Sequence, residues 1–197
     1  MRIKKAMILT AGYGKRMLPL TEITPKPLIK LGSKSLLERS IELLIRTGIK
    51  EIVLNIHHLP NAIEEFFKKK NFKVSIKLIR EGELLDTGGG IFNGTKQFKD
   101  EPFFVLNPDT IWSKNYYEEL KELENFYFTN KKPVLLLVDK KKSYDKSFKG
   151  DFNFTSNRII TREKINNYIF TGAQIVNRSI FSRVQKKKFS MNVIWDQ

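Results

Sequence analysis

The sequence predicts an α/β fold, in which a mostly parallel central sheet lies between two layers of helices. Short apolar runs alternate with segments of helical periodicity along most of the chain. The first apolar run ends directly at a glycine-containing loop, which is typical of a buried parallel strand. The chain has 197 residues, enough for one domain with a sizeable core. These observations predict a single domain with helices on both faces of its sheet.

The predicted elements follow one another as βα units. Residues 35–38 form a capping box that opens a helix, and Gly48 ends it. Further helices are expected at residues 61–70, shortly after Gly90, and at residues 116–128. The predicted strands are residues 6–9, 52–56, 74–79, 103–106 and 133–138. Strands joined through helices in this order pair side by side in parallel.

The pattern changes after Lys140. Residues 151–154, 158–161 and 168–170 indicate short, partly antiparallel strands. We interpret them as a small antiparallel layer added to the main sheet, because no linker of low complexity separates them from it.

The charge of the chain is strongly positive, at +15. Positive charge can indicate nucleic-acid binding, but these lysines are scattered and do not alternate with aromatic residues. We therefore expect a solvated, lysine-rich surface and no nucleic-acid partner. The same positive field favours the capture of small polyanionic substrates.

Several classes of protein are excluded or disfavoured by composition. The chain contains no cysteine, so neither disulfides nor thiolate metal sites can form. The basic N-terminus leads into an apolar run that is too short for a signal peptide or a membrane span. We expect a soluble cytoplasmic protein without a membrane partner.

The first candidate site is the loop of residues 9–16 after the first strand. In a parallel sheet this loop lies at the carboxyl edge, where ligands bind. Its small residues let a ligand approach the backbone, whose N–H groups can hold phosphate. The loop is neither a P-loop nor a dinucleotide fingerprint, since it lacks both Gly-Lys-Ser/Thr and a third glycine.

The residues after this loop sharpen its interpretation. Three prolines within residues 19–27 stiffen an extended segment and fix Arg16 and Lys26 in place. Fixed cations beside a glycine loop suit phosphoryl or nucleotidyl transfer, where catalysis is mainly positioning and charge stabilisation. The alternative is two solvated cations on an ordinary loop.

Residues 11–16, Pro19, Thr21 and residues 25–28 together resemble the signature of the sugar nucleotidylyltransferases. The resemblance covers nearly the whole chain. It implies a Rossmann-like three-layer α/β/α fold, a nucleoside triphosphate, Mg²⁺ and a sugar 1-phosphate. It also implies that Arg16 holds the β- and γ-phosphates and that Lys26 holds the reacting phosphates.

The second candidate site is the glycine-rich segment of residues 86–90. Three glycines that open a helix would allow a flat ligand or a phosphate to approach closely, although a plain helix start is the alternative. In the family, the similar segment packs its backbone against the nucleobase. Its form is most similar to that of the N-acetylmuramate-1-phosphate uridylyltransferases, and relatives acting on mannose or heptose phosphates carry similar versions.

The third candidate site is Asn107-Pro108-Asp109, at the end of the strand of residues 103–106. A carboxylate at this edge can bind Mg²⁺, which prefers oxygen ligands and phosphates. In the family the equivalent aspartate binds the catalytic metal, although proline stands here where glycine is usual. His57 and His58 follow another strand at the same edge, where we favour loop histidines over a catalytic one.

The resemblance extends these motifs into a set of expected site residues. We expect residues 1–139 to bind the nucleotide and residues 140–197 to lie on the sugar side. Catalysis is expected from Arg16, Lys26 and Asp109, with Asp109 as the metal ligand. The expected nucleotide-binding residues are Leu9, Ala11, Gly12, Gly14, Lys15, Asn55, Asp86, Thr87 and Gly88. The expected sugar-binding residues are Asn107, Asp151, Asn153, Thr171 and Gly172.

The expected reaction is an in-line attack of the sugar phosphate on the α-phosphorus of the triphosphate, with Mg²⁺ bridging the phosphates. The first choice of substrates is UTP and N-acetylmuramate 1-phosphate, which would place the protein in cell-wall nucleotide-sugar synthesis. The alternative is GTP and mannose 1-phosphate. A catalytically inactive nucleotide-sugar-binding regulatory protein is a further possibility, and the protein is expected to be a monomer or a homodimer.

The last eight residues, 190–197, resemble an N-cap and the first turns of a helix. The family normally continues into a second metal-binding aspartate near a Trp-x-Asp-Val-Gly pattern, which is absent from this sequence. We therefore expect an incomplete catalytic domain, in which Asp109 is the only protein ligand of the metal.

Overall fold

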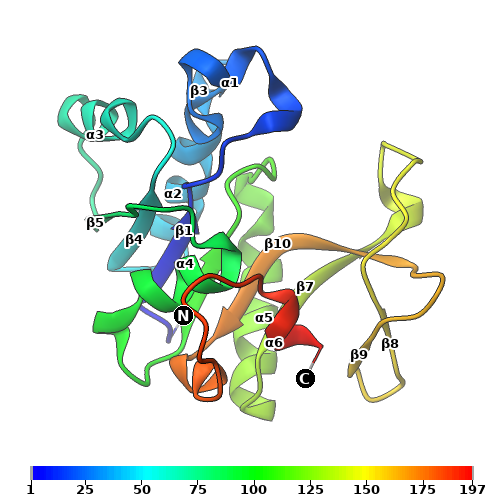
Figure 1. Ribbon diagram of the computed structural model, residues 1–197. Helices are drawn as coiled ribbons and strands as arrows, with labels where there is room; N and C mark the ends of the chain where they lie inside the picture. Colours follow the sequence, from blue (N-terminus) through cyan, green and yellow to red (C-terminus); the bar gives the residue numbers. More distant parts are fainter. Residues whose placement is uncertain (1, 197) are drawn as a thin grey trace.

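A six-stranded sheet forms the centre of the computed structural model, which describes residues 2–196 (Figure 1). Across the sheet the strands are β5 (Ser75–Arg80), β4 (Glu51–Ile56), β1 (Lys5–Leu9), β6 (Phe103–Leu106), β10 (Tyr168–Val176) and β7 (Val134–Asp139). Strand β10 pairs antiparallel with both of its neighbours, while β5, β4, β1 and β6 pair in parallel. The mostly parallel sheet is therefore confirmed.

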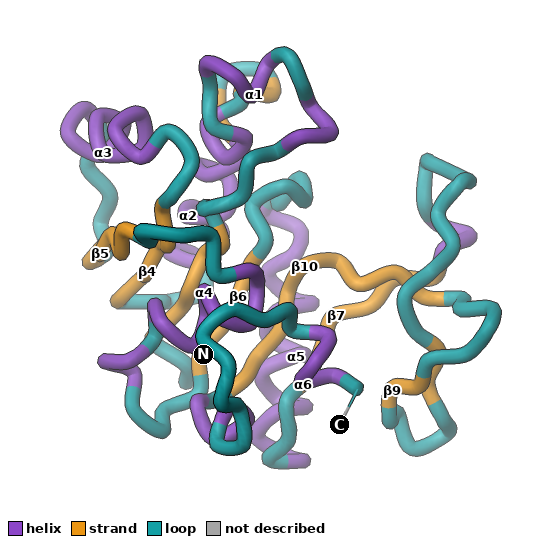
Figure 2. Tube along the Cα trace, viewed as in Figure 1, coloured by secondary structure: helices purple, strands orange, loops and turns teal. Residues whose placement is uncertain are grey.

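Figure 2 shows helices, in purple, packed around the orange strands of the sheet. Apolar side chains gather on both faces of this sheet, because successive residues of a strand point to opposite faces. On one face, Ile8 packs in a cluster with residues of α2 (Leu36–Arg46) and α5 (Tyr117–Asn130), which α3 (Pro60–Lys69) borders. On the other, Met7 packs with Ile91 of α4 (Asp86–Gly94) and with the C-terminal segment. This is the expected three-layer α/β/α architecture.

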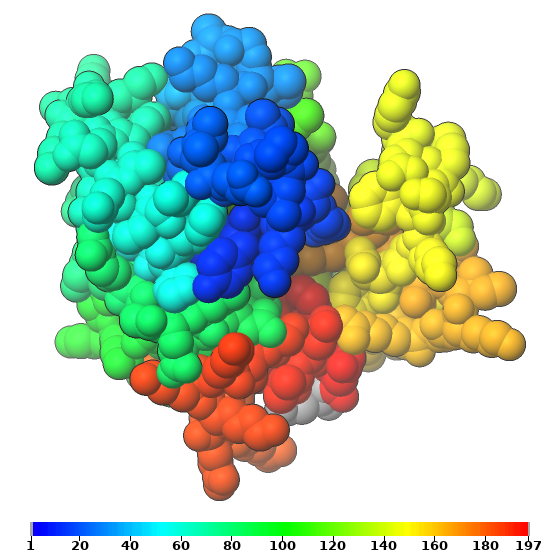
Figure 3. Space-filling model, turned by 45° about the horizontal axis from the view of Figure 1, so that its top comes forward, coloured from blue at the N-terminus to red at the C-terminus, as the bar shows by residue number. Residues whose placement is uncertain are grey.

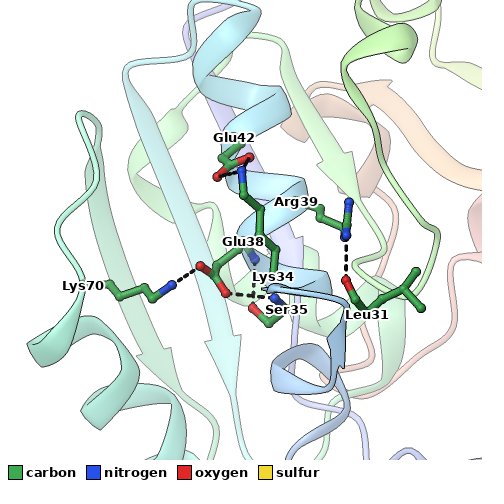
Figure 4. A network of polar contacts seen from close by, with 7 residues as sticks. All are labelled: Leu31, Lys34, Ser35, Glu38, Arg39, Glu42 and Lys70. Atoms are coloured by element: carbon green, nitrogen blue, oxygen red, sulfur yellow. Dashed lines mark hydrogen bonds and ion pairs between the residues drawn. The ribbon is translucent and has the colours of Figure 1, made fainter.

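The predicted capping box begins α2 (Figure 4). The Glu38 backbone N–H donates to the Ser35 hydroxyl at 3.2 Å, and the Ser35 backbone N–H donates to the Glu38 carboxylate at 2.8 Å. Burial raises the pKa of Glu38, but the Lys70 ammonium and the hydrogen bonds from Ser35 outweigh it, so that the pKa lies below its ordinary value. Lys70 thus ties the C-terminal end of α3 to the start of α2.

Two sequence predictions were wrong in their boundaries. Helix α4 begins at Asp86, so its three glycines lie inside the first turns and not before the helix. Residues 168–170, expected in an added layer, are the start of the long central strand β10. In both cases a contact distant in sequence decides the structure: α4 packs on β1 and β4, and β10 fills the gap between β6 and β7.

A two-stranded ribbon of β8 (Asn153–Phe154) and β9 (Ile160–Thr161) forms the rest of the predicted antiparallel layer. It projects from the body of the molecule, in yellow and orange in Figure 1. The Phe154 ring packs on the Tyr168 ring with centroids 4.4 Å apart, which anchors the ribbon to the start of β10. Figure 3 shows this projection standing apart from the blue N-terminal loop.

The shorter elements lie in the connections. The short strand pair is β2 (Lys30–Leu31) and β3 (Lys34–Ser35), and the short helices are η1 (Lys15–Met17), α1 (Leu20–Ile23), η2 (Lys26–Leu28), η3 (Lys96–Phe98), η4 (Lys114–Tyr116), η5 (Lys140–Lys142), η6 (Arg178–Phe181) and α6 (Asn192–Trp195). Helix α6 confirms the helical turn expected there, and Gln197 lies outside the described residues. Within residues 2–196, no helix is long and apolar enough to cross a membrane.

Candidate functional site

A cavity of about 370 Å³ lies where the chain leaves the carboxyl ends of β1, β4 and β6. This is the edge at which open α/β sheets bind ligands. The cavity brings together residues from all three candidate motifs. Its lining residues are Leu9, Thr10, Ala11, Gly12, Gly14, Lys15, Arg16, Lys26, Pro27, Asn55, Leu84, Asp86, Thr87, Asn107, Pro108 and Asp109.

The loop after β1 exposes backbone to this cavity. A Cβ built on Gly12 meets no atom within 4 Å, so this glycine faces open space. Gly14 has a left-handed backbone with φ of 64°, and a Cβ there would lie 2.9 Å from the Thr21 side chain. Because the Thr21 hydroxyl also donates to the Gly14 carbonyl at 3.1 Å, the loop has a fixed shape beside the cavity.

Lys26 and Asp109 form an ion pair in the lining of the cavity. The Lys26 ammonium lies 2.6 Å from the Asp109 carboxylate, although 83 residues separate them in sequence. Lys26 starts η2 directly after Pro25, and Asp109 sits in the turn after β6. Their side chains are 22% and 36% exposed, so both remain accessible to a ligand.

Arg16 supplies a second cation. It lies in η1 and is exposed, and within the described part of the chain no ion pair or hydrogen bond engages its guanidinium. Its neighbour Lys15 lies 5.7 Å from the centre of the Tyr13 ring. An unpaired guanidinium next to the Lys26–Asp109 pair gives the cavity an excess of positive charge, which suits a polyphosphate.

Hydrogen bonds to β10 hold the turn that contains Asp109. The Asn107 backbone N–H donates to the Gly172 carbonyl at 2.8 Å, and the Thr110 hydroxyl donates to the Thr171 carbonyl. Gly172 has φ of 88°, and a Cβ there would lie 2.7 Å from the Asn107 Cβ. Thr171 and Gly172 therefore support the turn and do not line the cavity, where we expected them to touch the sugar.

The buried indole of Trp112 also holds this turn. Its Nε1 donates to the Asn107 carbonyl at 2.9 Å, and the side chain is 1% exposed. The sequence reasoning missed Trp112, because a tryptophan in a loop carries no signal of which carbonyl it will reach.

Asn55 connects the β1 loop to the segment that precedes α4. Its Oδ1 accepts from the Thr10 backbone N–H at 3.0 Å, and its Nδ2 donates to Glu81 at 2.8 Å. The second Glu81 oxygen accepts from the Leu85 N–H at 3.3 Å. Asn55 lines the cavity as expected, but both ends of its amide hold the protein together, and Glu81 and Thr10 are partners that the sequence reasoning missed.

The two histidines anchor the other side of the β1 loop. His57 lies 3.1 Å from the Tyr13 hydroxyl and 2.9 Å from the Glu81 carbonyl, and His58 lies 2.7 Å from the Thr21 carbonyl. Both imidazoles contact the Tyr13 ring. These contacts support the interpretation of both residues as loop histidines.

The glycine-rich segment contributes less to the cavity than expected. Asp86 and Thr87 line it, but Gly88 does not. A Cβ on Gly88 would lie 2.4 Å from the Phe189 ring, and one on Gly89 would lie 2.5 Å from the Lys187 carbonyl. These glycines make room for another segment of the same chain.

Asp151 and Asn153, expected to bind the sugar, lie on the projecting ribbon. The Asp151 carboxylate accepts from the Phe170 N–H at 2.8 Å. The Asn153 amide donates to the Ile165 carbonyl and accepts from the Asn167 N–H. Neither residue lines the cavity, and both side chains hold the ribbon to its surroundings.

This site suits a divalent metal that is bound by one carboxylate together with substrate phosphates. No group of three or more histidine, aspartate or glutamate side chains capable of holding a metal occurs within residues 2–196. Asp109 offers an accessible carboxylate paired with Lys26, and Mg²⁺ can use one carboxylate together with substrate phosphates. The donor set therefore suits a metal that arrives with a polyphosphate.

An α/β sheet whose carboxyl edge carries a glycine loop, paired cation and carboxylate defines a phosphate-handling class of protein. The model of the nucleotidyl transferase family matches residues 5–146. The chain therefore belongs to this family, and the recognised resemblance to the sugar-1-phosphate nucleotidylyltransferases is confirmed.

Curated relatives agree with this assignment. The chain is 31% identical over 194 residues to a probable mannose-1-phosphate guanylyltransferase of Oryza sativa, covering 95% of this chain and 54% of that protein. It is 30% identical to the catalytic subunit beta of mannose-1-phosphate guanylyltransferase from Drosophila melanogaster, covering 95% and 52%. The chain thus spans about half the length of the curated relatives it matches.

Solved structures share the fold. HddC from Yersinia pseudotuberculosis, in a complex with GMP-PN, has a TM-score of 0.76 and 25% identity, and the match covers 96% of this chain and 83% of that one. A UDP-glucose pyrophosphorylase complexed with UDP-glucose has a TM-score of 0.77 at 17% identity, which covers 98% and 85% and shows the fold alone.

Proposed function

We propose that this chain transfers a nucleoside monophosphate from GTP to a sugar 1-phosphate, releasing pyrophosphate, with mannose 1-phosphate as the first sugar to test. The observation that carries the proposal is the Lys26–Asp109 pair, which lines the same cavity as the unpaired Arg16. The names of the curated relatives favour guanylyl transfer to mannose 1-phosphate over our first expectation of UTP and N-acetylmuramate 1-phosphate.

The charges orient the nucleotide in the cavity. Arg16, Lys26 and Asp109 lie where the triphosphate would be held, since guanidinium and ammonium groups pair with phosphate oxygens. The other wall consists of Leu84, Asp86 and Thr87, next to the start of α4. We place the base at that wall, because Gly12, which lines the same cavity, faces open space that a flat ligand can occupy.

The chemistry is a displacement at the α-phosphorus. A phosphate oxygen of the sugar 1-phosphate forms the new P–O bond, and the bond to the bridging oxygen of the β-phosphate breaks. The attacking phosphate is already ionised, so no general base is required. Arg16 and Lys26 stabilise the charge that develops on the leaving pyrophosphate and on the α-phosphate oxygens.

Asp109 has two partners in this scheme. Its carboxylate pairs with the Lys26 ammonium in the structure. A divalent metal held by Asp109 and the phosphates would neutralise phosphate charge, and the Lys26 ammonium would then be free to contact a phosphate oxygen. Removing divalent metal with a chelator should therefore abolish turnover.

The test is a pyrophosphate-release screen of four nucleoside triphosphates against a panel of sugar 1-phosphates. The panel includes mannose, glucose and N-acetylmuramate 1-phosphates. We expect release that requires both substrates and is greatest with GTP and mannose 1-phosphate. Greatest release with UTP and N-acetylmuramate 1-phosphate would restore the first expectation. Nucleotide binding without any release would favour the inactive regulatory protein.

A further inference from the structure

The C-terminal segment of residues 187–191 runs along the first turns of α4. The Phe189 N–H donates to the Leu85 carbonyl at 3.2 Å, and the Gly89 N–H donates to the Phe189 carbonyl at 3.0 Å. Figure 1 shows this red and orange segment beside the green helix, and Figure 3 shows the two in contact at the surface. Two segments about 100 residues apart in sequence are thus joined by their backbones.

The contact requires glycine in the helix. A Cβ on Gly88 would lie 2.4 Å from the Phe189 ring, and a Cβ on Gly89 would lie 2.5 Å from the Lys187 carbonyl. Both distances are shorter than any real contact of a Cβ. Glycine in a helix is destabilising by roughly 0.5–1 kcal/mol relative to alanine. Close approach of the C-terminal segment accounts for its presence at both positions.

The same segment reaches the wall of the cavity. The Met191 N–H donates to the Thr87 hydroxyl at 2.9 Å, and Thr87 lines the cavity where we place the nucleobase. Phe189 and Met191 are 5% and 1% exposed, so these two side chains anchor the segment in the core. Beyond it, the Trp195 indole lies 3.3 Å from the Gln174 side chain in β10.

We propose that residues 187–191 are a positioning strap for the nucleotide-binding wall, with Phe189 as its central residue. The strap touches neither the cations nor Asp109, so it acts through Thr87 and the start of α4. This inference rests on the proposed function for the identity of the ligand. It predicts that loosening the strap weakens nucleotide binding and leaves the displacement step unchanged.

The test measures the Kd for GTP in the presence of Mg²⁺ in four variants of the full chain: Gly88→Ala, Phe189→Ala, the double variant that combines them, and Gly94→Ala. Gly88→Ala places a methyl group against the Phe189 ring and should raise the Kd about tenfold. In a Phe189→Ala background the same Gly88→Ala change should raise it only about twofold, because the ring is gone and only the carbonyl of residue 189, 3.0 Å from the added Cβ, remains close. Gly94→Ala is the matched control. It adds a methyl group to the same helix, near the Met7 side chain and away from the strap, and should leave the Kd unchanged.

Additional readouts separate a positioning role from a general loss of structure. Melting curves identify variants that do not fold, and the KM for the sugar 1-phosphate should stay constant while the KM for GTP rises. An equal Gly88→Ala effect in both backgrounds, or an equal effect of Gly94→Ala, would overturn the strap while leaving the proposed function intact. A wild-type chain that binds none of the four nucleoside triphosphates would overturn the proposed function, and the strap with it.

Discussion

Two glycine segments of this protein resemble each other in sequence and differ in structure. The loop at Gly12 faces open space beside the cavity, where a ligand can approach. The segment at Gly88 and Gly89 is filled by the protein itself, by the Phe189 ring and the Lys187 carbonyl. Glycine marks a close approach to the backbone in both cases, but only the structure identifies what approaches.

The difference has a consequence for substitutions. At an open glycine, an added methyl group leaves the fold intact and interferes with the ligand. At a filled glycine, it strains the packing first and reaches the ligand only through the wall it displaces. Substitutions at the two kinds of glycine therefore separate effects on the ligand from effects on packing.

The largest effect is expected at the cations beside the open loop. Arg16→Ala should lower kcat by about 100-fold or more, because it removes a fixed charge that stabilises the transition state. Lys68→Ala is a control, since this exposed cation pairs with Glu65 on the surface of α3. A single-turnover assay with matched melting curves checks both variants, and near wild-type turnover of Arg16→Ala would remove that residue from the mechanism.

Substituting the two kinds of glycine tests the comparison itself. Gly12→Ala should change the free energy of unfolding by less than about 0.5 kcal/mol, since the methyl group meets no protein atom. Gly88→Ala should lower it by about 1–3 kcal/mol through overpacking against Phe189. Denaturant unfolding measures both values. A stability loss at Gly12 as large as that at Gly88 would show that protein atoms, and not open space, lie beside Gly12.

A destabilised variant outside both glycine segments shows whether lost stability alone affects binding. Glu38→Gln keeps an amide able to cap the start of α2 but removes the ion pair with Lys70. It should cost about 1 kcal/mol at pH 7 and leave the Kd for GTP unchanged.

The difference in stability between wild type and Glu38→Gln should depend on pH in a definite direction. The folded pKa of Glu38 lies below its ordinary value of 4.5. Its contribution to stability is therefore present above about pH 4.5 and is lost as the pH falls through the folded pKa. Unfolding measured from pH 7 to pH 3 should show the difference between wild type and Glu38→Gln shrinking in acid. A difference that grows in acid would contradict the assignment.

The smallest effect is expected at a residue that is not glycine although its backbone adopts a conformation that favours glycine. Lys131 ends α5 with a left-handed φ of 55°. Lys131→Gly should raise the free energy of unfolding by about 0.5 kcal/mol, since glycine adopts this conformation without strain. This variant isolates the effect of φ from those of packing and ligand. A thermal melt that shows destabilisation would mean that the contact of Lys131 with the Phe128 ring outweighs the strain.

Local signals in the sequence predicted much of the fold. The capping box at Ser35 placed the start of α2 correctly, because its two hydrogen bonds join residues three apart. The buried run before Gly12 placed β1, and the turn of Asn107 to Asp109 placed the end of β6, because both follow short apolar strands.

Features that depend on distant contacts escaped prediction. The place of β10 between β6 and β7 depends on pairing with strands at least 29 residues away, as for Tyr168 opposite Asp139. The sequence predicts a ligand beside Gly88 and Gly89 because it does not reveal that the Phe189 ring and the Lys187 carbonyl approach them. For the same reason the sequence predicted that Gly172 contacts the sugar, although its carbonyl accepts a hydrogen bond that supports the Asp109 turn.

The most direct test of this account is a crystal structure of the chain with a non-hydrolysable GTP analogue and Mg²⁺. We predict the triphosphate between Arg16, Lys26 and Asp109, with the Lys26–Asp109 distance longer than 2.6 Å. The base should lie over Gly12 and against the wall of Leu84 and Thr87. Nucleotide bound instead in the hollow beside Arg80 and Lys187, or a cavity with the Lys26–Asp109 pair intact under saturating nucleotide, would contradict it.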